Sequence, residues 1–145
     1  MQVDFWQLSR DPVEKVVGLI AERTRGAGGK LLVVAADDAQ RAAVGEALWD
    51  AKPAAFLANG EADAPHAPRQ PILLSRECAA ANGARYLVLA DGEWRDDAEG
   101  FERVFLLFGD AAVEAARTVW RKFDGREDVE RSYYAQEDGK WVKKA

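Results

Sequence analysis

Cysteine and histidine are almost absent from this sequence. Its 145 residues include one cysteine, Cys78, and one histidine, His66. A single cysteine excludes an internal disulfide framework and is typical of a protein kept in a reducing cytoplasm. The two residues also lack the spacing of a zinc site. We therefore predict a cytoplasmic protein without a metal or cofactor. Cys78 is expected to be a packed or loop residue, and His66 a surface residue rather than a catalytic base.

Long hydrophobic runs are missing as well. The longest, such as LLVVAA at 31–36, have the length of a strand and are far too short to cross a bilayer. The opening MQVDFWQL carries an acid and two aromatic residues where a secretory signal has a basic segment followed by an apolar stretch. The sequence therefore predicts neither membrane insertion nor secretion.

Positive charge is scarce: 20 Lys and Arg stand against 25 Asp and Glu, a net charge of −5. Residues 1–113 hold 12 of the basic and 18 of the acidic residues, and 114–145 hold eight and seven. This balance argues against wrapping duplex DNA. Direct binding of single-stranded DNA is disfavoured too, because no basic, aromatic-lined groove is recognisable. A small basic patch near the C-terminal end could attract an acidic partner.

Apolar segments and helical patterns alternate along the chain, which is typical of one α/β domain with an open sheet. The predicted strands are 3–8, 30–36, 71–75, 85–91 and 101–110. The predicted helices are 11–26, 39–50 and 111–123, and 58–70 is predicted to be a loop. Asp11 is expected to cap the first helix, with Pro12 at its first position. The tail at 131–145 is either an edge hairpin or a single ordered strand.

Two motifs invite a catalytic interpretation. GAGGK at 26–30 superficially resembles a phosphate-binding loop, but it lies between a helix and a strand in the wrong order, and a leucine follows the lysine. We interpret it as a helix end. Asp37 and Asp38 follow a predicted strand, where a helix N-cap is favoured over a metal or phosphoryl site. A nucleotide- or phosphate-binding enzyme using acids near Asp37 and Asp91 stays as the alternative function.

The last helix combines apolar and basic residues. Its apolar stripe, expected to face the sheet, comprises Val113, Ala116, Val119, Trp120 and Phe123. Arg117 and Arg121 flank that stripe next to Trp120 at helical spacing. Trp120 is either a boundary residue covered by arginine stems or part of a receptor for an acidic peptide that ends in an aromatic residue and a carboxylate.

A second aromatic segment, EALWDAKPAAFLANG at 46–60, follows the second predicted helix. Trp49 and Phe56 either cover a sheet edge or form an apolar anchor for a partner protein. The residues alone leave both interpretations open.

Taken in order, these segments resemble the chi subunit of bacterial DNA polymerase III holoenzyme over nearly the whole chain. The resemblance rests on Leu48–Trp49 followed by Phe56–Leu57, on the strand GFERV at 100–104, and on the Ala-Arg-x-x-Trp helix at 116–120. It implies a non-catalytic, mononucleotide-binding-like fold without a working nucleotide site. Such a fold is a three-layer, mostly parallel sheet with helices on both faces.

The resemblance also implies partners. Chi subunits bind the acidic C-terminal tail of single-stranded DNA-binding protein, which ends in a phenylalanine carboxylate, so their contact with nucleic acid is indirect. Matching the family's helix makes Arg117 the receptor for that carboxylate, with Trp120 at an aromatic position and Arg121 at a basic one. Leu106 would line the ring pocket. Val113 stands where some relatives have a basic residue.

A second implied partner is the psi subunit of the clamp loader. The family's psi-facing segment corresponds here to Trp49, Pro53, Phe56 and Leu57. The chain departs from the family at Ala58–Asn59, where Pro-His is frequent, so the local surface is expected to differ.

Overall fold

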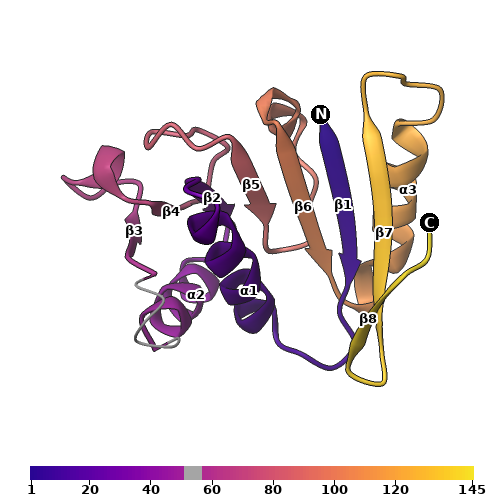
Figure 1. The fold of residues 1–145 in the computed structure, drawn as a ribbon, viewed down its shortest axis with the longest axis horizontal. Coiled ribbons are helices and arrows are strands. Elements are labelled where there is room, and N and C mark those ends of the chain that lie inside the picture. The colour runs from indigo at the N-terminus through magenta and orange to yellow at the C-terminus, as the bar shows by residue number, and fades with distance from the viewer. Residues whose placement is uncertain (51–56) are drawn as a thin grey trace.

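The computed structural model describes residues 1–50 and 57–145, and within these ranges it contains one eight-stranded sheet (Figure 1). The strands are β1 (Gln2–Gln7), β2 (Leu31–Val34), β3 (Asn59–Glu61), β4 (Ile72–Ser75), β5 (Tyr86–Leu89), β6 (Arg103–Phe108), β7 (Glu130–Glu137) and β8 (Lys140–Lys143). Their order in the sheet is β3-β4-β2-β5-β6-β1-β7-β8, and β8 alone of these pairs antiparallel to its neighbour.

Helices lie on both faces of this sheet. On one face, α1 (Val13–Gly26) and α2 (Asp38–Asp50) pack against each other and over β2, β4 and β5. On the opposite face, α3 (Val113–Lys122) lies behind β7 in Figure 1. Short 3-10 helices are η2 (Ala67–Arg69), η3 (Asp96–Gly100) and η4 (Asp110–Ala112). The predicted three-layer α/β architecture is therefore confirmed.

The two faces explain why the central strands read as continuous apolar runs. All four residues of β2 are fully buried, and alternate side chains enter different cores. Leu31 and Val33 join the core under α1 and α2, whereas Leu32 and Val34 join the core on the α3 face. A parallel strand covered on both sides has no solvent-facing positions, so its sequence shows no alternation.

The C-terminal segment forms the edge hairpin that was one of the two expectations. β7 pairs parallel with β1, which places Tyr133 opposite Phe5, and the chain then turns back into β8. Asp138 and Gly139 occupy the turn with φ values of +50° and +77°. An Asp-Gly pair tolerates these positive φ angles, which a two-residue hairpin turn requires.

The predicted cap of the first helix is wrong. Pro12, in an extended conformation, occupies the N-cap position, and Asp11 makes no capping contact. The Asp11 carboxylate instead accepts a hydrogen bond of 2.8 Å from Nε2 of Gln136. The Gln136 Oε1 accepts the backbone N–H groups of Arg10 and Asp11 at 3.0 and 3.1 Å. Gln136, which is 125 positions away in the sequence, thus binds the Asp11 carboxylate that was expected to cap the helix.

The segment 58–70 is more ordered than the predicted loop. It contains β3, which extends the sheet, and η2. Asn59 is buried, and its Nδ2 donates to the carbonyl oxygen of Leu57 at 3.1 Å. A Cβ on Gly60 would lie 2.9 Å from the side-chain Nε2 of Gln70, so a larger residue would displace that side chain. Residues 59–61 form a strand because they pair with β4, and residue composition does not reveal such pairing.

The glycine-rich segment 26–30 ends α1, as predicted. The backbone N–H of Gly29 donates to the Thr24 carbonyl at 2.9 Å, and Gly28 has a φ of +81°. This left-handed turn ends the helix and leads into β2. The glycines therefore form a helix C-terminus and not a phosphate-binding loop.

Candidate functional site

The α3 surface, which we define as Val113, Arg117, Trp120 and Arg121, joins apolar packing to exposed charge. The helix carries Glu114 in its first turn and Arg121 and Lys122 in its last, which suits the helix dipole. Ala116 and Phe123 are buried against the sheet, while Val113 and Trp120 are partly buried at its margin. The predicted apolar stripe is therefore confirmed, with the two arginines beside it at the exposed edge.

Aromatic neighbours hold Trp120 in place. Its ring centroid lies 5.1 Å from that of Phe5 in β1 and 6.0 Å from that of Tyr133 in β7, both in edge-to-face arrangements. Leu106, on β6, is fully buried in the same cluster. The structure thus brings Leu106, Val113 and Trp120 into one apolar cluster, with Leu106 in its interior and Trp120 at its rim.

The two arginines of the α3 surface make only surface contacts. Nη1 of Arg117 lies 2.9 Å from Oε1 of Glu114, and these side chains are 58% and 81% exposed. Nη2 of Arg121 contacts Oγ1 of Thr118 at 3.5 Å. Exposed ion pairs within one helix stabilise weakly and exchange readily. Both guanidinium groups are therefore accessible to an anionic partner.

Arg131 is a functional candidate that the sequence did not reveal. Its guanidinium carbon lies 4.4 Å from the Trp120 ring centroid, its Nη1 donates to the Trp120 carbonyl oxygen, and its Nη2 lies 2.7 Å from Asp124. This cation–π contact and the hydrogen bonds fix the indole and the end of α3. Only the pairing of β7 with β1 brings Arg131 here, and no local signal in the sequence predicts that pairing.

Tyr133 connects the α3 surface to the C-terminal hairpin. Its hydroxyl donates to Oε1 of Gln7 at 2.7 Å, and its backbone exchanges hydrogen bonds with Lys144 and Ala145. Burial raises the pKa of the Tyr133 phenol, and the charge of Arg117 acts in the opposite direction. Arg117 therefore lies within electrostatic reach of the aromatic cluster.

Three other cations near the C-terminal end of the chain have acidic partners, as Arg117 has in Glu114. Lys122 pairs with Asp96, Lys144 pairs with Glu137, and Arg126 lies 2.7 Å from both Glu99 and Asp128. Arg117 and Arg121 differ from these three cations in their position, because they lie beside Trp120 at helical spacing on the exposed edge of α3.

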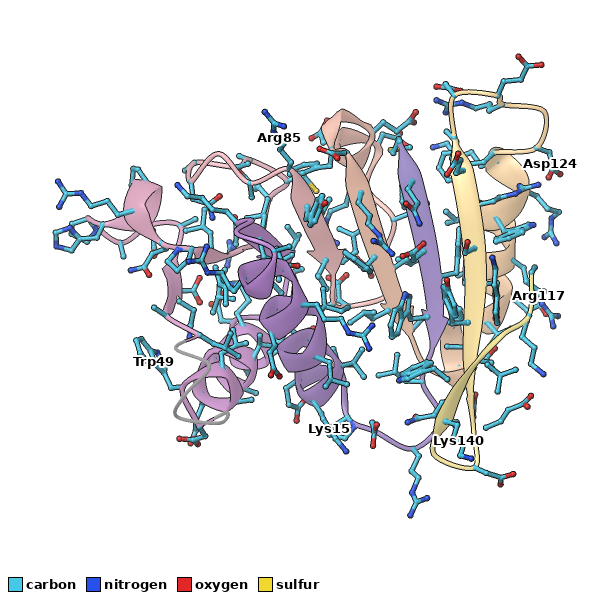
Figure 2. The ribbon with its side chains drawn as sticks, in the orientation of Figure 1. Lys15, Trp49, Arg85, Arg117, Asp124 and Lys140 are labelled. Carbon is cyan, nitrogen blue, oxygen red and sulfur yellow. The ribbon has the colours of Figure 1, made fainter. Side chains whose placement is uncertain are left out.

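The second predicted surface is represented by Trp49. This residue, at the end of α2, is 64% exposed, whereas Leu57 is buried. Pro53 and Phe56 lie outside the described residues. Figure 2 places Trp49 and Arg117 at opposite ends of the molecule. Two partners could therefore be held without competing for space.

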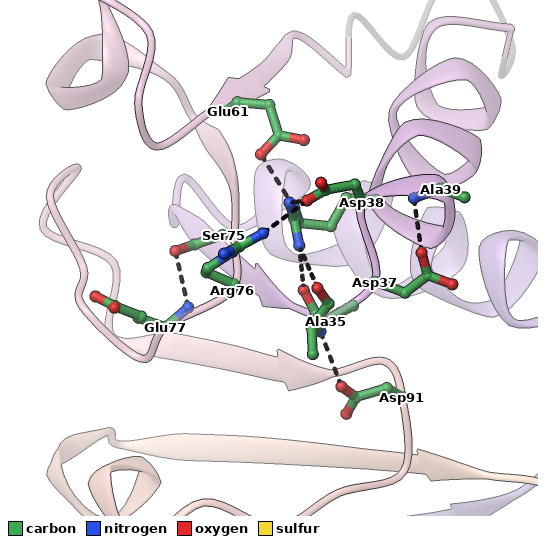
Figure 3. A network of polar contacts seen from close by, with 11 residues as sticks. Ala35, Asp37, Asp38, Ala39, Glu61, Ser75, Arg76, Glu77 and Asp91 are labelled. Atoms are coloured by element: carbon green, nitrogen blue, oxygen red, sulfur yellow. Dashed lines mark hydrogen bonds and ion pairs between the residues drawn. The ribbon is translucent and has the colours of Figure 1, made fainter.

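The acidic residues near the strand ends make hydrogen bonds and ion pairs within the protein (Figure 3). Oδ1 of Asp37 accepts the Ala39 N–H at 2.9 Å, which is an N-cap contact. Asp38 pairs with Arg41 and with Arg76. Hydrogen bonds from Arg76 and Arg41 lower the pKa of the Asp38 carboxyl.

Arg41 fills the space at these strand ends. Its side chain is 8% exposed, and its Nη1 donates to the carbonyl oxygens of Ala35 and Ala36 at 2.6 and 3.1 Å. Its Nε lies 3.2 Å from Glu61. Open α/β sheets bind nucleotides at this edge. In this protein the Arg41 side chain lies at that edge. The alternative nucleotide-binding interpretation therefore gains no support from this geometry.

Asp91 is also engaged internally. It binds Arg95 through two contacts of 3.0 and 2.8 Å and accepts the backbone N–H of Ala36 at 3.0 Å. Burial alone would raise the pKa of the Asp91 carboxyl, but these hydrogen bonds, with that from Glu93, outweigh burial and lower it.

We predict that Asp91→Asn lowers the free energy of unfolding by about 1–3 kcal/mol at neutral pH, because it removes a charged hydrogen-bonded pair. Since the folded carboxyl has a pKa below its ordinary 3.8, its contribution is present above that pH and is lost as the pH falls further. Urea unfolding of both proteins at neutral and strongly acidic pH measures this. A difference between the proteins that does not shrink in acid would contradict the assignment.

The remaining candidates are His66 and Cys78. His66 is exposed, as predicted, and Cys78 is partly buried, which raises the pKa of its thiol. Among residues 1–50 and 57–145 there is no group of three His, Cys, Asp or Glu side chains arranged to hold a metal ion. In the same ranges no helix combines the length and apolar character needed to span a bilayer.

Comparison with known protein families gives the following result. A family model described as DNA polymerase III chi subunit, HolC, matches residues 1–128. No curated protein matches the chain at a significant level.

Proposed function

Because this chain belongs to the DNA polymerase III chi subunit family, a family of replication accessory subunits, we propose that it tethers the clamp loader of the polymerase to single-stranded DNA-binding protein. In this proposal, the α3 surface grips the acidic C-terminal tail of single-stranded DNA-binding protein. The family resemblance supplies the partner, and the chemistry of the surface supports it.

One observation carries the proposal: two exposed arginines, Arg117 and Arg121, flank the half-buried ring of Trp120. A peptide that ends in an aromatic residue offers a ring and a carboxylate at adjacent positions. The ring would pack on the apolar margin of α3, and the carboxylate would accept charge-assisted hydrogen bonds from a guanidinium. The acidic residues before the terminus would add attraction that salt screens.

The mechanism is tethering and requires no bond chemistry. A weak contact with one tail raises the local concentration of the polymerase at strands coated by single-stranded DNA-binding protein. Such a contact can release quickly as the polymerase advances.

The experiment is a calorimetric titration with two tail peptides that differ only at the terminus, one with a free carboxylate and one amidated. We expect the free peptide to bind and the amide to bind at least about tenfold more weakly, as loss of a charged hydrogen bond implies. A parallel thermal-shift assay with ATP and magnesium tests the alternative. Equal binding of both peptides, or stabilisation by nucleotide alone, would contradict the proposal.

The second proposed contact is with the psi subunit, through Trp49. An exposed tryptophan is a frequent anchor at the centre of an interface. We predict that Trp49→Ala weakens binding of the psi subunit by more than about tenfold and leaves the free energy of unfolding within about 0.5 kcal/mol, because the ring is solvent-exposed. Size-exclusion chromatography with purified psi, and urea unfolding, measure the two effects. Undiminished complex formation would refute this assignment.

A further inference from the structure

The helix layer on the α1 face is incomplete. Helices α1 and α2 cover β2, β4 and β5, but Figure 1 shows no helix of the described residues in front of β6, β1 and β7. Parallel strands are normally covered on both faces. Strands β6, β1 and β7 therefore differ from this usual arrangement on the α1 face.

A hollow of about 380 Å³ lies over this open part of the sheet, between α1 and the C-terminal hairpin. Its volume falls in the range of small-ligand sites. Its lining includes five aromatic side chains: Trp6, Tyr86, Phe105, Tyr134 and Trp141. We call it the aromatic hollow.

Four of these aromatic side chains form one connected group. The Trp6 ring centroid lies 4.7 Å from that of Trp141, 5.4 Å from Tyr134 and 6.3 Å from Phe105. Trp6 and Phe105 are buried, whereas Tyr86, Tyr134 and Trp141 are partly exposed. The Nε1–H of Trp6 is buried without an acceptor among the described residues, which is uncommon in a folded protein. The buried Trp6 ring thus packs against the partly exposed rings of Tyr134 and Trp141, which can stack on a planar ligand.

Two basic side chains line the aromatic hollow, although the net charge of the chain is −5. Arg23 and Arg103 line it, and no Asp or Glu is among its lining residues. Arg103 is held by buried Asp4 at 3.0 Å and lies 4.8 Å from the Phe105 ring centroid. Arg23 is exposed on α1, and Lys143 stands opposite Tyr134 in the hairpin register.

We propose that the aromatic hollow binds an unpaired nucleobase together with a neighbouring phosphate, from a free nucleotide or from a single strand. Stacking on Trp141 and Tyr134 would hold the base, and Arg23 would contact the phosphate, the combination that single-strand binding sites use. Flat aromatic walls with flanking guanidinium groups suit a planar base better than an aliphatic side chain.

No basic, aromatic-lined groove is recognisable in the sequence, because the residues that line this hollow are scattered along the chain. The aromatic residues come from β1, β5, β6, β7 and β8, and only the fold brings them together. The hollow lies on the sheet face opposite α3. Its occupation is therefore independent of the proposed tail contact, and both ligands could be bound at once.

The test measures fluorescence anisotropy of a labelled short oligothymidylate at low salt, with thymidine monophosphate as competitor and a duplex of equal length as control. The variants are Trp141→Ala, Trp141→Phe and Arg23→Glu. Arg69→Glu is the matched control, because Arg69 is an exposed arginine on η2, outside the hollow. Each variant is also titrated with the tail peptide.

We expect weak binding of the single strand but not of the duplex. Trp141→Ala and Arg23→Glu should each weaken it about tenfold, and Trp141→Phe and Arg69→Glu less than about threefold. Affinity should fall with salt at a logarithmic slope near −1, as for one or two phosphate contacts. Competition by the monophosphate assigns a free nucleotide, and its absence assigns a strand.

The proposal is overturned if neither nucleotide nor strand binds, or if binding is unchanged in Trp141→Ala and Arg23→Glu. Since Arg23 is exposed on a helix, Arg23→Glu keeps the test decisive even if Trp141→Ala fails to fold. Tail-peptide binding that follows these variants would assign the hollow to a peptide instead. Failure of the tail proposal alone leaves the oligothymidylate result unaffected.

Discussion

Arg117→Ala is expected to weaken binding of the tail peptide by roughly 10- to 100-fold, the value of a charged hydrogen bond. In our account this guanidinium receives the terminal carboxylate, and its present partner, Glu114, is an exposed residue of the same helix. Little folding energy is lost with the side chain, because exposed pairs of this kind contribute little. Isothermal titration calorimetry with the free-carboxylate peptide measures the effect.

Two controls sharpen this result. Arg117→Lys keeps the charge but loses the planar fork that fits a carboxylate, so we expect an intermediate loss. Lys122→Ala removes a cation from the same helix that already pairs with Asp96, and it should change binding less than about threefold. If Lys122→Ala weakened binding as much as Arg117→Ala, the effect would reflect general charge, and a specific carboxylate site would be ruled out.

Phe5→Ala is expected to lower the free energy of unfolding by about 3–5 kcal/mol, as for other large buried aromatic residues. The Phe5 ring is fully buried, stacks 6.2 Å from Tyr133 and meets Trp120 at 5.1 Å. Its removal leaves a cavity where β1, β7 and α3 meet. Urea unfolding followed by circular dichroism measures the loss.

The control for Phe5→Ala is a large apolar residue near the surface. Leu19→Ala, on α1, removes a side chain that is 40% exposed and should cost less than about 1.5 kcal/mol. A loss below about 1 kcal/mol for Phe5→Ala would show that the junction of β1, β7 and α3 is not the packed core that supports the α3 surface.

Much of the fold could be predicted because its signals are local. Continuous apolar runs mark β2 and β6, and helical spacing marks α1 and α3. The predicted strand and helix segments all contain the observed elements or overlap them. The C-terminal hairpin stayed open to two interpretations, because β7 is partly exposed and its parallel pairing with β1 depends on residues far away in sequence.

The errors share the same origin. Asp11 failed as a cap because Gln136 reaches its carboxylate, and β3 was missed because its partner β4 lies across a loop. In the candidate site, helical spacing alone placed Arg117, Trp120 and Arg121 together. Contacts across the sheet, such as that of Arg131 with Trp120, have no local signature. Local sequence patterns thus predict which residues share one face of α3, but they do not predict which residues of the strands contact that face.

The most direct test of the central proposal is an NMR titration of the isotope-labelled protein with the free-carboxylate tail peptide. Our account predicts that the largest shifts of backbone amides fall in α3 and in β7 around Tyr133. Shifts concentrated instead at the strand ends near Asp37 and Asp91, or around Trp141, would contradict it.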